Sequence, residues 1–242
     1  MKKQIIEFSG GKDSTAMLHM MLERGEQIDD VIFFDGGWDW PQMFEHLDLV
    51  EEKTGIKITR LKPEHDFDYY MFKHKPDPKR LKREPWVGCG WPGTTTRWCT
   101  REKAVNINRY LNELKKEYEV IQCVGFAVGE ERRLKKKMLE SQFRYPLIEY
   151  NVDEKECLLY CKRLGYTWGG LYEYFDRVSC FCCPLQCKKE MFLKKRHFPE
   201  MWNRIREMDA ELRKPEHKFS PGQRWRPNKY FSEIDAEIRG KD

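Results

Sequence analysis

A glycine-containing turn at residues 9–14 (SGGKDS) constrains this chain more than any other feature. It directly follows an apolar segment, residues 4–8 (QIIEF), and directly precedes residues 14–22, whose apolar side chains recur at helical spacing. Two adjacent glycines between a strand and a helix let backbone amides approach an anion, and the helix N-terminus favours negative charge. The turn therefore predicts a phosphate-binding loop.

The segments that follow alternate between strand and helix patterns. Residues 31–34 and 56–59 are short apolar runs typical of buried strands, and residues 43–53 between them have a helical pattern. A helix is expected over residues 101–117 and a further strand over residues 118–125. This alternation predicts an α/β fold, a Rossmann-like parallel sheet flanked by helices.

The chain is expected to have two parts. A nucleotide-binding domain is predicted over residues 1–150, with a proline-rich loop insertion near residues 63–98 and a short extended segment at residues 145–148. A helical C-terminal region that carries a cysteine cluster is predicted over residues 151–242. Its tail, from Lys214 onward, is expected to lie on the surface or to be partly mobile.

Composition narrows the class of protein. The apolar runs are too short to span a membrane, and the N-terminal sequence leads into a strand rather than a signal peptide, so a cytoplasmic location is expected. The net charge of +5 accompanies 35% charged residues, which favours a solvated surface over a nucleic-acid face. The basic runs at residues 79–83 and 132–137 keep a nucleic-acid interpretation open.

The nine cysteines are unevenly distributed, and in a cytoplasmic chain they indicate thiols, metal ligands or redox chemistry rather than a disulfide scaffold. Four thiolates that converge can close a tetrahedral Zn²⁺ site or bind an iron–sulfur cluster. The predicted metal ligands are Cys99, Cys180, Cys183 and Cys187. Cys89 and Cys182 are the alternatives for the fourth position, and a redox pair of Cys89 with Cys187 remains open. The remaining cysteines, Cys123, Cys157 and Cys161, are expected to be buried as small apolar side chains.

The spacing of the turn at residues 9–14 fits neither the Walker loop GxxxxGK[ST] nor the dinucleotide fingerprint GxGxxG. It resembles the SGGxDS pyrophosphatase loop (PP-loop) of the adenine nucleotide α-hydrolase superfamily, the N-type ATP pyrophosphatases. An ordinary capped turn is the structural alternative.

Further segments resemble the phosphoadenosine phosphosulfate (PAPS) reductase-like branch of that superfamily. Residues 34–41 (FDGGWDWP) are similar to its D-T-G-x-E-x-P segment, with Gly36 in place of Thr. Residues 124–133 (VGFAVGEERR) are similar to its G-x-x-x-D-E-x-x-R motif, with Gly129 in place of Asp. The other similar segments are residues 97–103 (RWCTREK), 144–147 (RYPL) and 180–185 (CFCCPL), so the resemblance spans about residues 4–205.

The resemblance implies that the chain binds ATP or a related adenine nucleotide together with Mg²⁺. The residues expected to hold the nucleotide are Ser9, Gly10, Gly11, Lys12, Asp13, Ser14, Asp35, Gly36, Gly37, Lys103 and Arg133. The expected catalytic residues are Lys12, Asp13, Arg101 and Glu130, with Asp13 acting as a helix cap or a Mg²⁺ ligand. Relatives that thiolate nucleic acids hold a [4Fe–4S] cluster, which favours that cluster over Zn²⁺.

Three functions are considered. In the first, the chain adenylates an acceptor oxygen with release of pyrophosphate, and a sulfur nucleophile then displaces AMP; its partners are a nucleic-acid or small acceptor and a sulfur-donor protein. The second is reduction of adenylyl sulfate or phosphoadenylyl sulfate, which the absence of a C-terminal Glu-Cys-Gly-Ile-His segment weakens. The third is a nucleotide-binding module with a structural metal. The sequence leaves the oligomeric state open.

Overall fold

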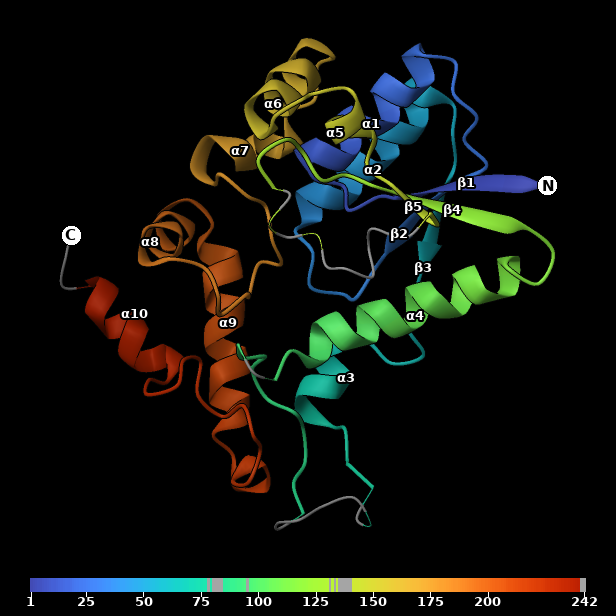
Figure 1. Cartoon of the computed structure of the whole chain (residues 1–242). Helices are drawn as coiled ribbons and strands as arrows, with labels where there is room; N and C mark the ends of the chain where they lie inside the picture. The colour runs from blue at the N-terminus through green and yellow to red at the C-terminus, as the bar shows by residue number, and fades with distance from the viewer. Residues whose placement is uncertain are drawn as a thin grey trace. The chain divides into compact units, whose positions relative to one another are not determined.

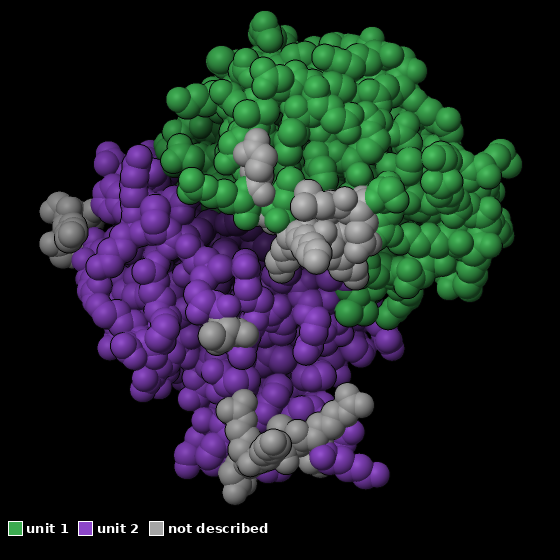
Figure 2. All heavy atoms as spheres, viewed as in Figure 1, with its two compact units in different colours: residues 1–35, 40–61, 105–178 green, residues 36–39, 62–104, 179–242 purple. Residues whose placement is uncertain are grey.

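The computed structural model divides into two compact units, which are coloured separately in Figure 2. Unit 1 comprises residues 1–35, 40–61 and 105–178, and unit 2 comprises residues 36–39, 62–104 and 179–242. The residues that the structure describes are 1–77, 79, 85–94, 96–130, 132, 134 and 141–239. The domain boundary expected near residue 150 stays a prediction.

Unit 1 contains a five-stranded parallel sheet with the strand order β3-β2-β1-β4-β5. The strands are β1 (Lys2–Glu7), β2 (Asp30–Phe34), β3 (Ile58–Leu61), β4 (Glu119–Val124) and β5 (Phe143–Arg144). Ile6 of β1 pairs with Val31 of β2 on one side and with Cys123 of β4 on the other. The sheet and its helices confirm the predicted Rossmann-like α/β fold.

Helices cover both faces of this sheet. The helices within unit 1 are α1 (Lys12–Glu23), α2 (Pro41–Thr54), α5 (Pro146–Glu149), α6 (Glu154–Arg163) and α7 (Leu171–Tyr174), preceded by the 3-10 turn η4 (Trp168–Gly170). Helix α1 packs against α5 and α6 on one side of the sheet in Figure 1. Ile5 and Ile6 are both fully buried although adjacent strand residues point to opposite faces, so neither face of β1 is left to solvent.

Helix α4 (Trp98–Leu114) begins in unit 2 and ends in unit 1. In its second half, the hydroxyl of Tyr110 donates a hydrogen bond to Asp30 at the start of β2. This bond and the buried side chains of Ile107 and Leu111 fasten the C-terminal part of α4 to the unit that holds the sheet.

Unit 2 is helical. Besides the start of α4 it contains α3 (Phe67–Phe72), α8 (Lys188–His197), α9 (Pro199–Leu212), η5 (Pro215–His217) and α10 (Phe231–Arg239). Helix α9 packs against both α8 and α10. The rings of Trp38, Phe67 and Trp98 meet edge to face with centroids 5.2–5.5 Å apart, an arrangement that aromatic quadrupoles favour.

Three local expectations are wrong. Residues 145–148 are not extended, because Pro146 occupies the first position of α5, where its missing N–H costs nothing. The insertion contains α3, which begins at Asp66, whose carboxylate accepts a hydrogen bond from Tyr69 N. The tail is built into unit 2, since Phe231 is fully buried and packs on Trp202.

No helix among the described residues is both long enough and apolar enough to cross a membrane.

Candidate active site

The glycine turn at residues 9–14, called the phosphate loop after its expected role, lies between the end of β1 and the start of α1, as predicted. Its role in binding phosphate stays a prediction. Gly10 has φ +74°, and a Cβ there would lie 2.3 Å from the sulfur of Met43, so only glycine fits without displacement. Gly11 is the N-cap of α1 and offers no capping side chain. The first-turn amides of α1 are therefore not capped by a side chain at this position, and the positive end of the helix dipole faces the loop.

Two serines fix the shape of the loop. The hydroxyl of Ser14 donates to Gly11 O at 3.0 Å and accepts from Ser9 N at 3.2 Å, and the two serine hydroxyls lie 3.1 Å apart. The turn is thus closed by its own polar side chains, which is the kind of preorganisation that anion binding needs.

The loop lies at the point where the strand order reverses. Strand β1 has β2 on one side and β4 on the other, although two strands separate β1 from β4 in the chain. Gly125, directly after β4, approaches the loop so closely that a Cβ there would lie 3.2 Å from Ser14 N. In open parallel sheets, ligands bind beyond the carboxyl ends of the strands at this kind of switch point.

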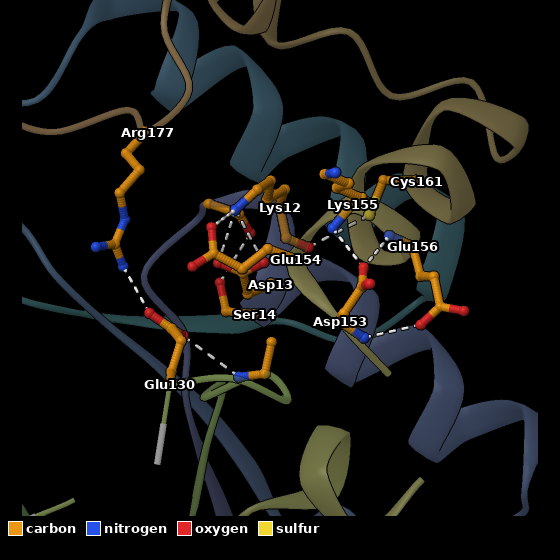
Figure 3. A network of polar contacts seen from close by, with 12 residues as sticks. Lys12, Asp13, Ser14, Glu130, Asp153, Glu154, Lys155, Glu156, Cys161 and Arg177 are labelled. Atoms are coloured by element: carbon orange, nitrogen blue, oxygen red, sulfur yellow. Dashed lines mark hydrogen bonds and ion pairs between the residues drawn. The ribbon is translucent and has the colours of Figure 1, made fainter. Parts of the chain in front are cut away.

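Lys12 is buried at the start of α1 with only 5% of its surface exposed. Its ammonium donates to Asp13 at 3.1 Å and to Glu154 of α6 at 2.9 Å, as Figure 3 shows. Burial lowers the pKa of Lys12, but the two carboxylates outweigh burial and raise it above its usual value. The lysine is therefore a fixed positive charge beside the loop.

Carboxylates outnumber the cation at this point. Burial raises the pKa of Asp13, and the negative charges of Glu154 and Glu130 add to this effect while Lys12 opposes it. Glu130 is held in place by Ala127 N at 3.3 Å and by Arg177 at 3.0 Å. Mg²⁺ in nucleotide sites takes one or two carboxylates together with phosphate oxygens, and this cluster has the residue types for it.

The expected capping role of Asp13 is not observed, since Gly11 is the N-cap and Asp13 lies in the first turn. The alternative role, as a Mg²⁺ ligand, stays a prediction. The two expected catalytic carboxylates, Asp13 and Glu130, lie near enough for the charge of Glu130 to contribute to the raised pKa of Asp13.

Sequence reasoning missed four residues that build the loop's surroundings: Glu154, Trp168, Tyr172 and Arg177. The indole of Trp168 donates to Gly10 O at 2.7 Å, and the hydroxyl of Tyr172 accepts from Lys12 N at 2.9 Å. Trp168 has φ +50°, a strained value for a non-glycine residue, and is followed by two left-handed glycines. The pair Gly169-Gly170 marks an unusual turn in the sequence, but nothing in the sequence connects it to residue 10.

The residues after β2 are divided between the units, with Asp35 in unit 1 and Gly36 and Gly37 in unit 2. Asp35 N donates to Leu61 O at 2.9 Å. A Cβ on Gly36 would lie 2.5 Å from the ring of Phe67. A threonine, which the similar family segment has at this position, would therefore collide with that ring. The nucleotide role of these three residues stays a prediction.

The expected basic residues are placed as follows. The Arg101 side chain is 67% exposed and pairs with Glu102 at 3.3 Å, and Lys103 is also exposed. Arg133 lies outside the described residues, as do most of the two basic runs. Arg101 and Lys103 belong to unit 2 and the loop belongs to unit 1, and the roles of the two basic residues stay predictions.

Three of the four predicted metal ligands lie near one another in unit 2. Cys99 is in the first turn of α4, and Cys180 and Cys183 lie in the loop before α8. Burial raises the pKa of the Cys180 thiol well above its usual value, and Asp39, Cys183 and Cys99 raise it further. A bound cation would reverse this electrostatic balance, because coordinating thiols are deprotonated.

Cys187 has a different local role. It is the N-cap of α8, where its sulfur accepts from Glu190 N at 3.5 Å and its own N–H donates to the Glu190 carboxylate at 2.9 Å. This is a capping box built on a thiol, and the side chain is exposed. The two alternatives for the fourth ligand, Cys89 and Cys182, are both buried.

The two candidate metal centres need different spacings between the thiol sulfurs. Zinc with Zn–S bonds of about 2.3 Å places its sulfurs roughly 3.8 Å apart. Among the described residues, no three cysteine sulfurs lie within 4.8 Å of one another. A four-iron cluster binds each thiolate to a different iron and so accommodates a wider set. The choice between an iron–sulfur cluster and zinc at these cysteines stays a prediction.

A buried lysine supports the cysteine loop. Lys194 of α8 is fully buried, and its ammonium donates to Phe181 O and to the side-chain oxygen of Gln186. Burial lowers the pKa of Lys194 to about 8, against the raising effect of the neighbouring thiols. Phe181 N in turn donates to Trp38 O at 3.1 Å, so both backbone polar groups of Phe181 are hydrogen-bonded.

Next to the cysteine loop, unit 2 contains a cavity of about 720 Å³. Its lining includes Cys187, Trp225, Arg224 and Arg226, together with residues 91–94. Cys187 is therefore the cysteine that this cavity exposes to a solute.

The parallel sheet and the glycine turn at its switch point define an α/β nucleotide-binding domain of the Rossmann-like class. Residues 3–186 match the family model of the phosphoadenosine phosphosulfate reductase domain. The match covers most of the chain, so this protein belongs to that family, whose members bind adenine nucleotides.

Two curated relatives come from Methanocaldococcus jannaschii, and both are described as uncharacterized. The first is 28% identical over 232 residues, which are 93% of this chain and 44% of the relative. The second is 25% identical over 206 residues, 81% of this chain and 45% of the relative. The chain thus spans less than half the length of these relatives.

Proposed function

We propose that the chain is an ATP pyrophosphatase that adenylates an acceptor oxygen and thereby prepares the acceptor for sulfur transfer. The observation that carries the proposal is the preformed loop at the switch point of the sheet, with the buried ammonium of Lys12 beside it. Pyrophosphate is a multiply charged leaving group, and a fixed cation with a helix N-terminus stabilises the charge that develops on it.

The proposed chemistry has two steps. The acceptor oxygen attacks the α-phosphorus of ATP, the bond to the β-phosphate oxygen breaks, and pyrophosphate leaves. A hydrosulfide or thiol sulfur then attacks the carbon that bears the adenylated oxygen, and AMP leaves with that oxygen. Adenylation is needed because an unmodified oxygen is a poor leaving group.

The chain's own residues would act mainly by positioning. The loop amides and the hydroxyls of Ser9 and Ser14 bind the phosphates, and Lys12 moves from its carboxylates toward them. The displaced carboxylates, Asp13 and Glu154, are then available to bind Mg²⁺. The hydrogen bonds of Trp168 and Tyr172 keep the loop in shape during this exchange.

The cysteines Cys99, Cys180 and Cys183 would hold a [4Fe–4S] cluster, with the fourth ligand to come from Cys187 or one of its alternatives, and Zn²⁺ remains the second option. If only these three cysteines bind it, such a cluster would supply one iron for sulfide or another sulfur ligand. The acceptor, a nucleic acid or a small molecule, the sulfur-donor protein and the cytoplasmic location also remain parts of this proposal.

The test follows the α-phosphate of ATP. Protein incubated with Mg²⁺, ATP labelled at the α-phosphate and a mixture of tRNA and DNA is expected to yield AMP and pyrophosphate rather than ADP. Lys12→Gln is expected to lower this turnover by about 100-fold. Lys155→Gln is the matched control, since it removes an exposed lysine of α6 that donates no hydrogen bond to the loop. ADP as the product, or equal losses in both variants, contradicts the proposal.

Reduction of a sulfonucleotide is the second candidate, and the name of the family favours it. Incubation with adenylyl sulfate or phosphoadenylyl sulfate and a dithiol would release sulfite in that case. Binding of adenine nucleotides without turnover in either assay would instead indicate the nucleotide-binding module with a structural metal.

A further inference from the structure

A histidine and two glutamates meet at the C-terminal end of α9, outside the residues that match the family model. Ligand atoms of Glu211, Glu216 and His217 all lie within 4.8 Å of one another. We propose that these three side chains form a second metal site, which binds a divalent ion of the zinc type independently of the cysteines.

The ring of His217 is already oriented for a metal. Its Nδ1 lies 2.9 Å from Val87 O, and since a carbonyl only accepts, Nδ1 carries the proton. In the neutral ring, Nε2 then carries no proton and has a lone pair available for a metal. Metal-binding histidines characteristically donate their other N–H to a carbonyl or carboxylate in this way, which fixes the ring and makes the ligating nitrogen more basic.

The Nε2 atom of His217 is buried and has no hydrogen-bond partner among the described residues. The side chain is only 1% exposed, and Nε2 lies 4.0 Å from Glu211 Oε1 and 3.9 Å from Glu216 Oε1. A buried polar atom without a partner is costly, so it points to a ligand between the ring and the two carboxylates. This observation is independent of the two acidic residues themselves.

The distances are close to those of a real site. Metal–ligand bonds of about 2.0 Å to nitrogen and oxygen give ligand separations of roughly 3.3 Å in a tetrahedron. The separations from Nε2, 3.9 and 4.0 Å, are longer than this by about 0.6–0.7 Å. The Glu216 side chain is 59% exposed and can shorten its own distance by rotating, while Glu211 would need a shift of similar size. Waters would complete the coordination, since the chain supplies three ligands.

The charge around the site favours a cation. Lys214 pairs with Glu211, but through the other carboxylate oxygen, Oε2, at 2.6 Å. Oε1, which faces His217, is left for the metal. With two carboxylates, one lysine and a neutral imidazole, the site has a net charge of −1, and a divalent ion can bind without displacing Lys214.

A metal here would tie three segments of unit 2 together. Glu211 lies in the last turn of α9, Glu216 and His217 belong to η5, and Val87 belongs to the insertion. The same segments are already joined by Ser220, which donates to Gly88 O at 2.8 Å, and by the bridge between Gly90 and Gly222. The ion would therefore stabilise the attachment of the tail rather than take part in the phosphate-loop chemistry.

The experiment separates this site from the cysteines by using Co²⁺ in place of Zn²⁺. Thiolate-bound Co²⁺ gives strong near-ultraviolet charge-transfer bands, whereas Co²⁺ bound by nitrogen and oxygen does not. The 242-residue chain, stripped of metal, is titrated with Zn²⁺ calorimetrically and with Co²⁺ spectroscopically. The variants are Glu216→Gln and the double variant Glu211→Gln/Glu216→Gln, with Glu207→Gln as the control on an exposed position of α9.

The double variant is expected to bind about one Zn²⁺ fewer than the wild type, and Glu216→Gln to bind it at least 10-fold more weakly. The thiolate bands should be unchanged, and the rise in Tm that Zn²⁺ produces should shrink in both variants but not in Glu207→Gln. Equal stoichiometry and equal Tm shifts in the wild type and the double variant would overturn the proposal. Because Glu216 is exposed, its variant tests the site without disturbing the core.

Discussion

Two buried clusters of charge, one in each unit, use similar residues in opposite ways. At the phosphate loop, Asp13 contacts a buried lysine and yet its pKa is raised, because burial and two further carboxylates outweigh that one cation. Between α9 and α10, Asp235 is also buried, but it accepts hydrogen bonds from Arg206 and Trp202 and pairs with Lys195 at 3.2 Å. Burial acts to raise the pKa of Asp235, and these donors instead lower it to about 2.

The difference distinguishes a candidate ligand-binding cluster, at Asp13, from a structural cluster, at Asp235. The hydrogen-bond donors and positive charges around Asp235 outweigh the cost of burying its carboxylate, so its negative charge stabilises the folded chain. Around Asp13, Lys12 alone does not outweigh burial and the neighbouring carboxylates, so the negative charge of Asp13 is disfavoured until a cation joins the cluster. Binding sites tend to hold such unfavourable charge arrangements, because the ligand completes them.

The largest expected effect comes from Asp13→Asn, which tests the site directly. We expect the formation of AMP and pyrophosphate to fall by about 100-fold, since the variant loses a candidate Mg²⁺ ligand. The free energy of unfolding at pH 7 should not fall, because a raised pKa means that the charged form of Asp13 is unfavourable in the folded protein. Turnover assays and urea unfolding measure the two effects. A variant with full activity would break the comparison.

Asp235→Asn should show the opposite pattern. Its carboxylate has a folded pKa of about 2, below the unfolded value of roughly 3.9, so it stabilises the fold above about pH 5 and this contribution is lost as the pH falls toward 2. We expect the variant to lose about 2 kcal/mol of unfolding free energy at pH 7. The loss should shrink to less than about 0.5 kcal/mol in urea unfolding near pH 2, where about half of the folded-state carboxylates are protonated, with nucleotide affinity unchanged throughout. A loss that persists near pH 2 would show that packing, not charge, is responsible.

Mg²⁺ alone should distinguish the clusters further. An ion that binds only the folded state at ten times its Kd stabilises that state by about 1.4 kcal/mol. We expect a corresponding Mg²⁺-dependent rise in Tm for the wild type and for Asp235→Asn, and none for Asp13→Asn. Ca²⁺ and Na⁺ at matched ionic strength are the controls. A rise of equal size in all three proteins would mean that Mg²⁺ binds elsewhere.

The smallest effects concern two indoles in matching positions. Trp168 donates to Gly10 O at 2.7 Å in the loop, and Trp202 donates to Asp235 at 2.9 Å in the scaffold. Replacing either by Phe removes one hydrogen bond, worth about 1 kcal/mol. We expect Trp168→Phe to weaken ATP binding by roughly 5-fold and Trp202→Phe to lower stability alone. Equilibrium binding and thermal unfolding of both variants separate these results.

The strand, glycine turn and helix of residues 4–22 and the parallel sheet could be predicted because their determinants are local. The pattern of residues 4–22 specifies a strand, a glycine turn and a helix within a few residues of one another, and the alternation downstream specifies parallel strands. The burial of Cys123, Cys157 and Cys161 also follows from their positions on a strand and a helix. The expectation of an extended segment at residues 145–148 was wrong, because Pro146 is compatible both with extended backbone and with the first position of a helix.

Tertiary structure alone decided which distant side chains complete each site. Glu154 reaches Lys12 across 142 positions of sequence, and Trp168 reaches Gly10 across 158. Residue type and spacing carry no information about such contacts, because they depend on how helices pack rather than on local backbone preference. The same holds for His217: its Nδ1 donates to Val87 O in the insertion, and this contact leaves Nε2 as the unprotonated nitrogen. The sequence by itself determined the fold and the place of the phosphate loop, and packing determined the charges that surround it.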